Sequence, residues 1–303
     1  MGMEKKMRRA KKIALFVAAI LVINLILSFV ITKLVYDSVF DRYVPQTAED
    51  CLSDLTDCRE DTSFYSGDNL LKGQYLDSEG DSLVIVAHGI NSAAAEIAPL
   101  AEKVFLLGYD VFVFDMTGSG ESEGESAVGF CQSVLDLRAA IDHAEESFEY
   151  EKLFLLGHSR GGYGAVCVLE SHEEKIDGVI AVSAPNSAMD AIIAASVDKV
   201  GFLAYGNYPM LYIYQVMLFG SECVSLSCDK VIDDTSVPVM IIHGKDDGTI
   251  PADRFSAYSH KGSPRLDSAE LLEIDGDHTS VLESRELTAA IDSFFKDIEK
   301  GGE

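Results

Sequence analysis

Gly157-His158-Ser159-Arg160-Gly161 fits the G-x-S-x-G pattern of a nucleophile elbow and is the most informative stretch of the chain. The apolar run 153–156 precedes it, and a glycine-rich helix start follows. Such a strand, turn and helix would hold the serine at the tip of a strained turn, because glycines let the backbone bend. The pattern also occurs by chance in glycine-rich turns, so the rest of the chain has to decide between the two.

Apolar runs of strand length recur on both sides of this motif, and helix-like stretches such as 96–107 and 133–146 separate most of them. Continuous apolar strands separated by helices indicate an α/β fold with a mostly parallel sheet and helices on both faces. Residues 64–76, with a turn at 66–69, predict an antiparallel hairpin at the sheet edge. The six runs are Leu83 to Ala87, Val111 to Phe114, Leu153 to Leu156, Val179 to Val182, Val239 to Ile242 and Leu271 to Ile274.

The interval between Pro185 and Val237 is too long for a simple crossover, and it is rich in tyrosine, methionine and leucine. Insertions after strand ends overhang the ligand crevice of an open sheet, so we expect a helical cap over residues 186–236. A core helix pair that merely covers the sheet is the alternative. An apolar cap would favour an acyl or aromatic substrate group.

The N-terminus carries the sharpest change in composition. Residues 1–12 are a basic tail, and residues 13–32 are an uncharged run that spans a hydrocarbon core of roughly 30 Å at about 1.5 Å per residue. The positive-inside rule then puts the tail in the cytoplasm and the remainder outside the cell membrane. A cleaved signal peptide is the alternative, although its apolar region is usually only ~7 to 15 residues. Residues 33–60 would form a polar stalk or short helix before an α/β domain at 61–299.

The formal net charge of −26 argues against nucleic acid or anionic lipid as a partner, and we interpret it as a contribution to solubility. Nothing in the composition sets the oligomeric state. The close cysteine pairs Cys51/Cys58 and Cys223/Cys228 suit disulfides in an extracytoplasmic domain, with free thiols as the alternative. Without a C-x-x-C pattern and nearby histidines, we expect no zinc or other metal site.

A serine hydroxyl needs a base within hydrogen-bond reach, and that base needs an orienting acid. His278, in the loop after the run 271–274, is the best candidate base among the seven histidines. Asp247, after the run 239–242, completes the order serine, aspartate, histidine that this fold uses. The neighbouring aspartates at positions 246, 275 and 277 remain alternatives for the acid on spacing alone.

Acyl transfer also requires two donors for the oxyanion, and backbone amides can supply both. The Arg160 N–H follows the serine at a helix N-terminus, where amides and dipole favour negative charge. The Ile90 N–H, in His88-Gly89-Ile90-Asn91 after the run 83–87, is the second candidate. We expect His88 to brace this loop.

These motifs resemble those of the α/β-hydrolase superfamily over residues 64–297. His88-Gly89 resembles its H-G oxyanion loop, and residues 115–122 resemble its D-x-R-G-x-G-x-S loop, except that Thr117 replaces the usual arginine. In residues 243–251 the position matching the family acid is Asp247, one beyond Asp246, and Gly276-x-His278 matches the histidine loop. The resemblance extends to bacterial membrane-anchored hydrolases of the serine-aminopeptidase-like or monoacylglycerol-lipase-like branch.

The resemblance implies a serine hydrolase that needs no metal or organic cofactor. We expect it to cleave a small or medium carboxylic ester through an acyl-enzyme on Ser159. A serine peptidase or amidase, a lipase and an acyltransferase are alternatives within the fold. A catalytically idle surface interaction module is an alternative of a different class, because a fold does not fix a function.

Overall fold

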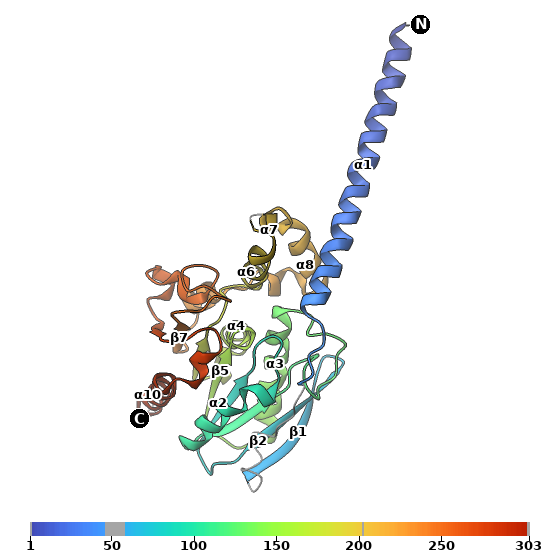
Figure 1. Ribbon diagram of the computed structural model, residues 1–303. Helices are drawn as coiled ribbons and strands as arrows, with labels where there is room; N and C mark the ends of the chain where they lie inside the picture. The colour runs from blue at the N-terminus through green and yellow to red at the C-terminus, as the bar shows by residue number, and fades with distance from the viewer. Residues whose placement is uncertain (1, 46–57, 202, 302–303) are drawn as a thin grey trace.

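The computed structural model, which describes residues 2–45, 58–201 and 203–301, is built on one eight-stranded sheet in the order β1-β2-β4-β3-β5-β6-β7-β8 (Figure 1). Strand β2 is antiparallel to both of its neighbours, and every pair from β4 to β8 is parallel. All six predicted apolar runs are strands of this sheet, and the predicted hairpin forms β1 and β2. The strands are β1 Arg59–Ser66, β2 Asn69–Leu76, β3 Ser82–Ala87, β4 Asp110–Phe114, β5 Lys152–His158, β6 Gly178–Val182, β7 Val239–Gly244 and β8 Glu270–Ile274.

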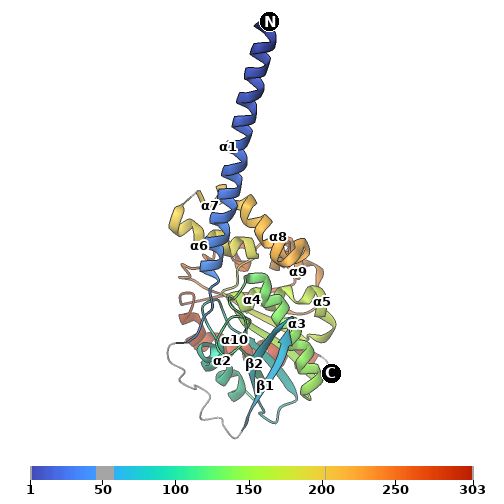
Figure 2. The same cartoon turned by 90° about the vertical axis from the view of Figure 1, so that its right-hand side faces the viewer.

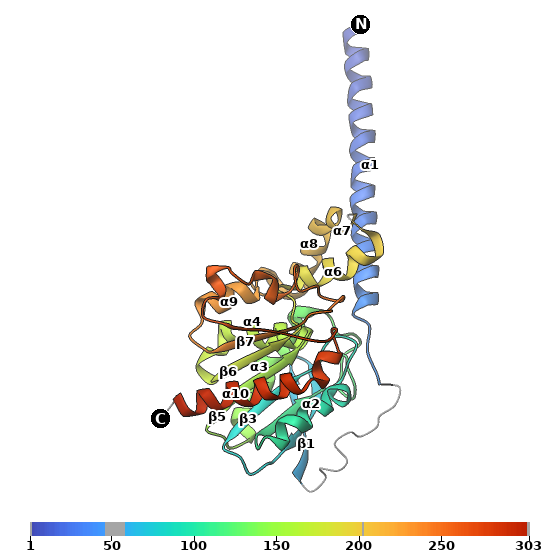
Figure 3. The ribbon, with the colours of Figure 1, turned by 60° about the vertical axis from the view of Figure 1, so that its left-hand side comes forward.

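Helices cover both faces of the sheet, as the alternating sequence predicts. Helices α2 and α10 lie on one face, and α3 and α4 lie on the other (Figure 3). Strands β3, β4, β6 and β7 are buried along their whole length, which explains their continuous apolar sequences. The helices beyond the N-terminal one are α2 Ala94–Leu106, α3 Phe130–Ser147, α4 Arg160–Cys167, α5 Leu169–His172, α6 Ala188–Val200, α7 Leu203–Gly206, α8 Tyr208–Val224, α9 Cys228–Asp234 and α10 Arg285–Gly301.

Helix α10 shows how sequence spacing selects the buried side of a helix. Its buried residues Leu287, Ile291, Phe294 and Phe295 recur at intervals of three and four, which places them on one stripe. Phe295 stacks on Phe154 of β5, with ring centroids 4.3 Å apart. Burial of this stripe therefore fixes the last helix of the chain against the centre of the sheet.

Helix α1, Gly2–Val39, is the one described helix long and apolar enough to cross a membrane (Figure 1). It continues past residue 33 to Val39, so the first part of the predicted stalk 33–60 is helical. The chain then runs along the loop 118–127, where Tyr43 exchanges backbone hydrogen bonds with Gly118 and Gly120. Residues 46–57 of the predicted stalk lie outside the described residues.

The long insertion after β6 divides into two parts. Helices α6, α7 and α8 stand together on the side of the domain from which α1 leaves (Figures 1 and 2). Helix α9 instead packs on α4 and buries Cys228, Val231 and Ile232 in the core. The interval 186–236, predicted to be a cap, thus holds α6–α8 on that side and α9 against α4.

The cysteines do not form the second disulfide suggested by their spacing. Cys223 and Cys228 are both free and buried, because the turn between α8 and α9 directs each thiol to a different neighbour. The Cys223 thiol approaches the Cys131 carbonyl at 3.9 Å, and the Cys228 thiol approaches the Pro185 carbonyl at 3.4 Å. Cys58 is also free, and Cys51 lies outside the described residues.

Candidate active site

Ser159 occupies a strained turn between β5 and α4. Its φ of 53° and ψ of −114° are unusual for a residue with a side chain, and its N–H donates to the Val182 carbonyl at 2.8 Å. A Cβ at Gly157 would lie 2.3 Å from the Gly161 carbonyl oxygen, and a Cβ at Gly161 would lie 2.2 Å from the Ala87 carbonyl oxygen. Both glycines are therefore required for helix α4 to pack this closely against the sheet.

The structure brings together the three side chains predicted from the sequence. Ser159 Oγ lies 3.0 Å from His278 Nε2, and His278 Nδ1 lies 2.7 Å from Asp247 Oδ2. His278 comes from the loop after β8, and Asp247 comes from the loop after β7, so parallel strands deliver all three to the same sheet edge. In this arrangement Nδ1–H donates to the carboxylate, which leaves Nε2 free to accept the serine proton.

Asp247 is held in its charged form. Burial opposes ionisation, but the hydrogen bond from His278, the nearby imidazoles and the Ile250 N–H outweigh it, so the pKa of Asp247 lies below its ordinary value. The second carboxylate oxygen accepts the N–H groups of Thr249 and Ile250 at 2.9 and 2.8 Å. Because the acid is anchored at both oxygens, it can orient the imidazole without moving.

The three rival aspartates lie elsewhere in these loops. Asp246 is exposed, and the Asp275 carboxylate pairs with Lys245 at 2.6 Å on the surface. Asp277 accepts the N–H groups of Thr279 and Ser280 and thereby shapes the histidine loop. Of these four aspartates, only Asp247 has a hydrogen bond to His278 among the described contacts.

The register of the sheet places the predicted oxyanion loop beside the serine. Ala87 of β3 pairs with Gly157 of β5, so the chain at Gly89 and Ile90 leaves the sheet next to the elbow. A Cβ on Gly89 would lie 3.4 Å from Ser159 Cβ, which shows how closely the two loops approach. Arg160 is the first residue of α4, so its backbone N–H lies at the N-terminus of this helix. Backbone amides at this position favour a negatively charged ligand atom.

Two buried histidines brace this region, and both stay neutral. His88 Nδ1–H donates to the Gly89 carbonyl at 2.8 Å, while its Nε2 accepts the Met116 N–H at 2.9 Å, so this histidine braces its loop as expected. Burial, with the charge of Arg160, lowers the pKa of His88 to about 3. His158 donates through Nε2 to the His278 carbonyl at 2.7 Å, and burial lowers its pKa to about 4. The sequence did not predict that His158 holds the loop of His278, and only its position directly before Ser159 pointed to the active site.

Thr117, which departs from the family pattern, takes part in a buried polar cluster. Its N–H and hydroxyl both donate to the Asp136 carboxylate, at 2.9 and 2.8 Å. The same carboxylate accepts hydrogen bonds from Ser66 and Gln132. The loop is therefore braced by a carboxylate on helix α3, in place of an arginine of its own.

The Arg160 side chain is a second feature that sequence reasoning missed. It is fully buried, and its guanidinium contacts the Ala127 carbonyl and the Met116 sulfur, each at 3.3 Å. Burial lowers its pKa to about 10, with the Asp136 charge opposing that shift, so it remains cationic at neutral pH. A positive charge is thus buried beneath the loops that flank the serine.

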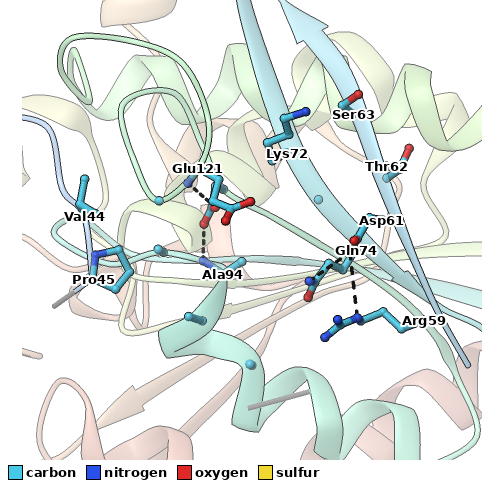
Figure 4. A pocket seen from close by; sticks show the side chains of 16 residues that line it. Val44, Pro45, Arg59, Asp61, Thr62, Ser63, Lys72, Gln74, Ala94 and Glu121 are labelled. Atoms are coloured by element: carbon cyan, nitrogen blue, oxygen red, sulfur yellow. Dashed lines mark hydrogen bonds and ion pairs between the residues drawn. The ribbon is translucent and has the colours of Figure 1, made fainter. Parts of the chain in front are cut away.

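A cavity of about 850 Å³ lies beside the first strands rather than at the serine (Figure 4). Its lining includes Arg59, Gln74 and Asp115, and none of Ser159, Asp247 and His278 belongs to it. The Asp115 carboxylate at its wall accepts the N–H groups of Ala94 and Glu121. This cavity is therefore distinct from the serine centre, and its Asp115 carboxylate braces the start of α2 and the loop at Glu121.

Comparison with known proteins relates the chain to hydrolases. Residues 78–214 match the family model described as serine aminopeptidase S33, which covers Ser159 and ends before Asp247. Human monoglyceride lipase is 31% identical over 104 residues, or 34% of each chain, so the match spans about a third of that relative. The uncharacterized protein YfhR of Salmonella typhimurium is 28% identical over 224 residues, covering 71% of this chain and 70% of the relative.

Solved structures share the architecture. An esterase from Pyrococcus furiosus has a TM-score of 0.66 at 22% identity, covering 86% of this chain and 97% of the esterase. Est1E from Butyrivibrio proteoclasticus, solved with ferulic acid bound, has a TM-score of 0.62 at 19% identity, covering 79% and 99%. At these identities the likeness concerns the fold, which is the one predicted. Together with the sequence matches, it establishes that the chain is a member of the α/β-hydrolase superfamily.

Proposed function

We propose that the protein is a serine hydrolase that cleaves a small or medium carboxylic ester, with Ser159, His278 and Asp247 as its catalytic residues. The observation that carries the proposal is the continuous hydrogen-bonded chain from Ser159 Oγ through His278 to Asp247, at 3.0 and 2.7 Å. A binding module has no need of such a chain. This distinguishes the proposal from a catalytically idle surface interaction module.

The geometry supports a two-step reaction. Ser159 Oγ attacks the ester carbonyl carbon while His278 Nε2 accepts the hydroxyl proton. The backbone N–H groups of Ile90 and Arg160 donate hydrogen bonds that stabilise the negative charge on the carbonyl oxygen. The C–O bond to the leaving group then breaks, and His278 returns the proton to the departing alcohol. Water, activated by the same imidazole, attacks the acyl-enzyme, releases the carboxylic acid and restores Ser159.

An ester is favoured over an amide, because an alcohol is a better leaving group than an amine. The names of the related lipases and esterases support this choice. A peptidase or amidase is the second candidate, favoured by the serine aminopeptidase family model that matches residues 78–214. Lipase and acyltransferase activity would use the same residues with a different acyl chain or acceptor.

A fluorophosphonate probe tests the serine directly, since it reacts with an activated serine whatever the natural substrate is. We expect the folded protein to be labelled and Ser159→Ala to lose the label. Absence of labelling in the folded wild type would count against a hydrolase. Ester and amide substrates of graded acyl length would then separate the esterase from the peptidase, and a flat profile would argue against a shaped apolar pocket.

We further propose that α1 is an uncleaved membrane anchor, with its basic N-terminus in the cytoplasm and the catalytic domain outside. The support is its length, its apolar composition and the basic residues that precede the span. Protease added to intact cells should digest the domain. If the domain is fully protected in intact cells and digested only after lysis, the domain is cytoplasmic and the proposed orientation is wrong.

A further inference from the structure

The cap is attached to the part of α1 proposed to lie in the membrane. Asn207, directly before α8, donates from Nδ2 to Thr32 Oγ1 at 2.8 Å. Its carbonyl oxygen accepts the Ser28 hydroxyl at 3.4 Å. Both partners belong to the uncharged run 13–32, so the start of α8 lies level with the last turn of that run.

Further contacts fix the direction of α8 along α1. The Tyr214 hydroxyl donates to Asp37 Oδ1 at 2.7 Å. The Tyr214 ring forms T-shaped contacts with Phe29 and Tyr36, with ring centroids 5.8 and 5.1 Å apart. Asn207 thus contacts residues 28 and 32, while Tyr214, farther along α8, bonds residue 37. The beginning of α8 therefore points toward the membrane span, and its end points toward the domain (Figure 2).

An exposed apolar surface lies next to these contacts. We call it the cap face. No Asp, Glu, Lys or Arg occurs from position 201 to 221, in a chain with 24 basic and 50 acidic residues. Large apolar side chains left uncovered in a soluble domain mark an interaction surface. The cap face consists of Tyr205 and Tyr208, which flank Asn207 in sequence and are 53 and 43% exposed. Ile213, Met217 and Leu218 are also exposed, but they lie farther along α8 toward the domain.

We propose that the cap face inserts into the lipid leaflet from which α1 emerges, so that the catalytic domain is docked on the bilayer through its cap. A span of about 20 residues fills the hydrocarbon core, which places Ser28 and Thr32 within its last turns. Asn207 bonds both, so the neighbouring Tyr205 and Tyr208 reach the same depth. Tyrosine suits this level, because its ring is apolar and its hydroxyl is polar.

The polar groups near the span are paired in the manner that a bilayer requires. Asn207, Ser28 and Thr32 satisfy one another, and Thr32 also donates to the Ser28 carbonyl at 2.8 Å. Lys33 and Asp37 form an ion pair at the level where the helix leaves the apolar layer. The whole chain has a net charge of −26 even with its basic tail 1–12 included, so the domain is more acidic still. Anionic headgroups would repel it, which makes a zwitterionic lipid the appropriate partner.

The chain contains no tryptophan, so a single introduced tryptophan reports its own surroundings. We would place one at Tyr205 or Tyr208 in the full-length protein, reconstituted in phosphatidylcholine vesicles with or without brominated acyl chains. Leu106→Trp and Tyr65→Trp are matched controls, because these side chains are 71 and 67% exposed but lie on α2 and β1. We expect blue-shifted emission that brominated lipid quenches at positions 205 and 208, and neither effect at the controls.

Three results would overturn the proposal. Equal emission without quenching at all four positions would place the cap face in water, and equal quenching at all four would show no preference for the cap. A blue shift at position 205 that brominated lipid leaves unquenched would indicate that protein, such as a second copy of the chain, covers the face. Because the inference rests on the anchor, flotation of each variant with the vesicles separates failure of the anchor from failure of cap insertion.

Discussion

His278 Nδ1 lies 2.7 Å from Asp247 Oδ2, and the other Asp247 oxygen is held by two backbone N–H groups of its own loop. The imidazole is thus oriented by an acid that is itself immobile. Its backbone carbonyl is held as well, because the buried His158 donates to it at 2.7 Å. The base is therefore fixed at its ring by the loop after β7 and at its main chain by the last residue of β5.

Asp247→Asn should lower kcat for ester hydrolysis by roughly 10³- to 10⁴-fold, because the amide favours the wrong imidazole tautomer and removes the balancing charge. Steady-state kinetics on an activated ester would measure the loss. Asp246→Asn is the matched control, since that side chain is exposed one position away. Comparable losses in both variants would contradict the role assigned to Asp247.

Acid should destabilise the fold through the two neutral histidines. The folded pKa values of His88 and His158 are about 3 and about 4, below the 6.5 of a free imidazole, so the unfolded chain binds protons first. Their contribution is present above pH 6.5 and is lost as the pH falls from there toward 3 to 4. On the order of 2 kcal/mol per histidine should be lost between pH 7 and 5.

Urea unfolding at pH 7 and pH 5 would measure that loss. His88→Asn should unfold with a smaller difference between the two pH values than the wild type, because one of the two protons taken up on unfolding is gone. A wild-type free energy of unfolding that stays constant over this interval would contradict the burial of neutral imidazoles.

Gly161→Ala should reduce the free energy of unfolding by about 1 to 3 kcal/mol, because the new methyl would collide with the Ala87 carbonyl. The shift would displace the elbow, so fluorophosphonate labelling should slow as well. Gly206→Ala is the control, since a Cβ there meets no heavy atom within 4 Å. Thermal unfolding of the two variants should therefore diverge, and equal melting temperatures would argue against the close packing of α4.

Arg42 ties the chain after α1 to the loop 118–127. Its guanidinium donates to the carbonyls of Gly120, Ser122 and Gly124 at 2.9, 2.8 and 2.7 Å. Arg42→Ala should cost about 1 to 3 kcal/mol and raise amide hydrogen exchange in that loop. Arg42→Lys should recover only part of the protection, because one ammonium cannot reproduce the planar fork.

Arg254→Ala, on a different loop where the guanidinium lies over the Phe255 ring, should leave exchange at 118–127 unchanged. If Arg42→Ala behaves in the same way, the Arg42 contacts carry no stability. The segment after α1 would then be held to the domain by its other contacts, such as the backbone hydrogen bonds of Tyr43 with Gly118 and Gly120.

Local patterns in the sequence were enough to predict the sheet, because a strand buried on both faces needs an unbroken apolar run wherever its partners lie. Glycine spacing around Ser159 predicted the elbow, because a tight turn there needs residues without a Cβ. A Cβ on Gly157 would collide with Gly161 four positions on, whereas the collision of a Cβ on Gly161 with the Ala87 carbonyl appears only in three dimensions. Selecting Asp247 over Asp246 required the family motif, since spacing alone left both open.

Only the tertiary structure decided which distant groups meet. The neutral state of His88 and His158, the buried charge of Arg160 and the Asp136 cluster at Thr117 depend on burial by elements far apart in the chain. The free thiols of Cys223 and Cys228 likewise follow from the turn that separates them. Asn207 and Thr32 are 175 positions apart, and no periodicity predicts their contact, because side-chain pairing across a fold depends on packing in three dimensions.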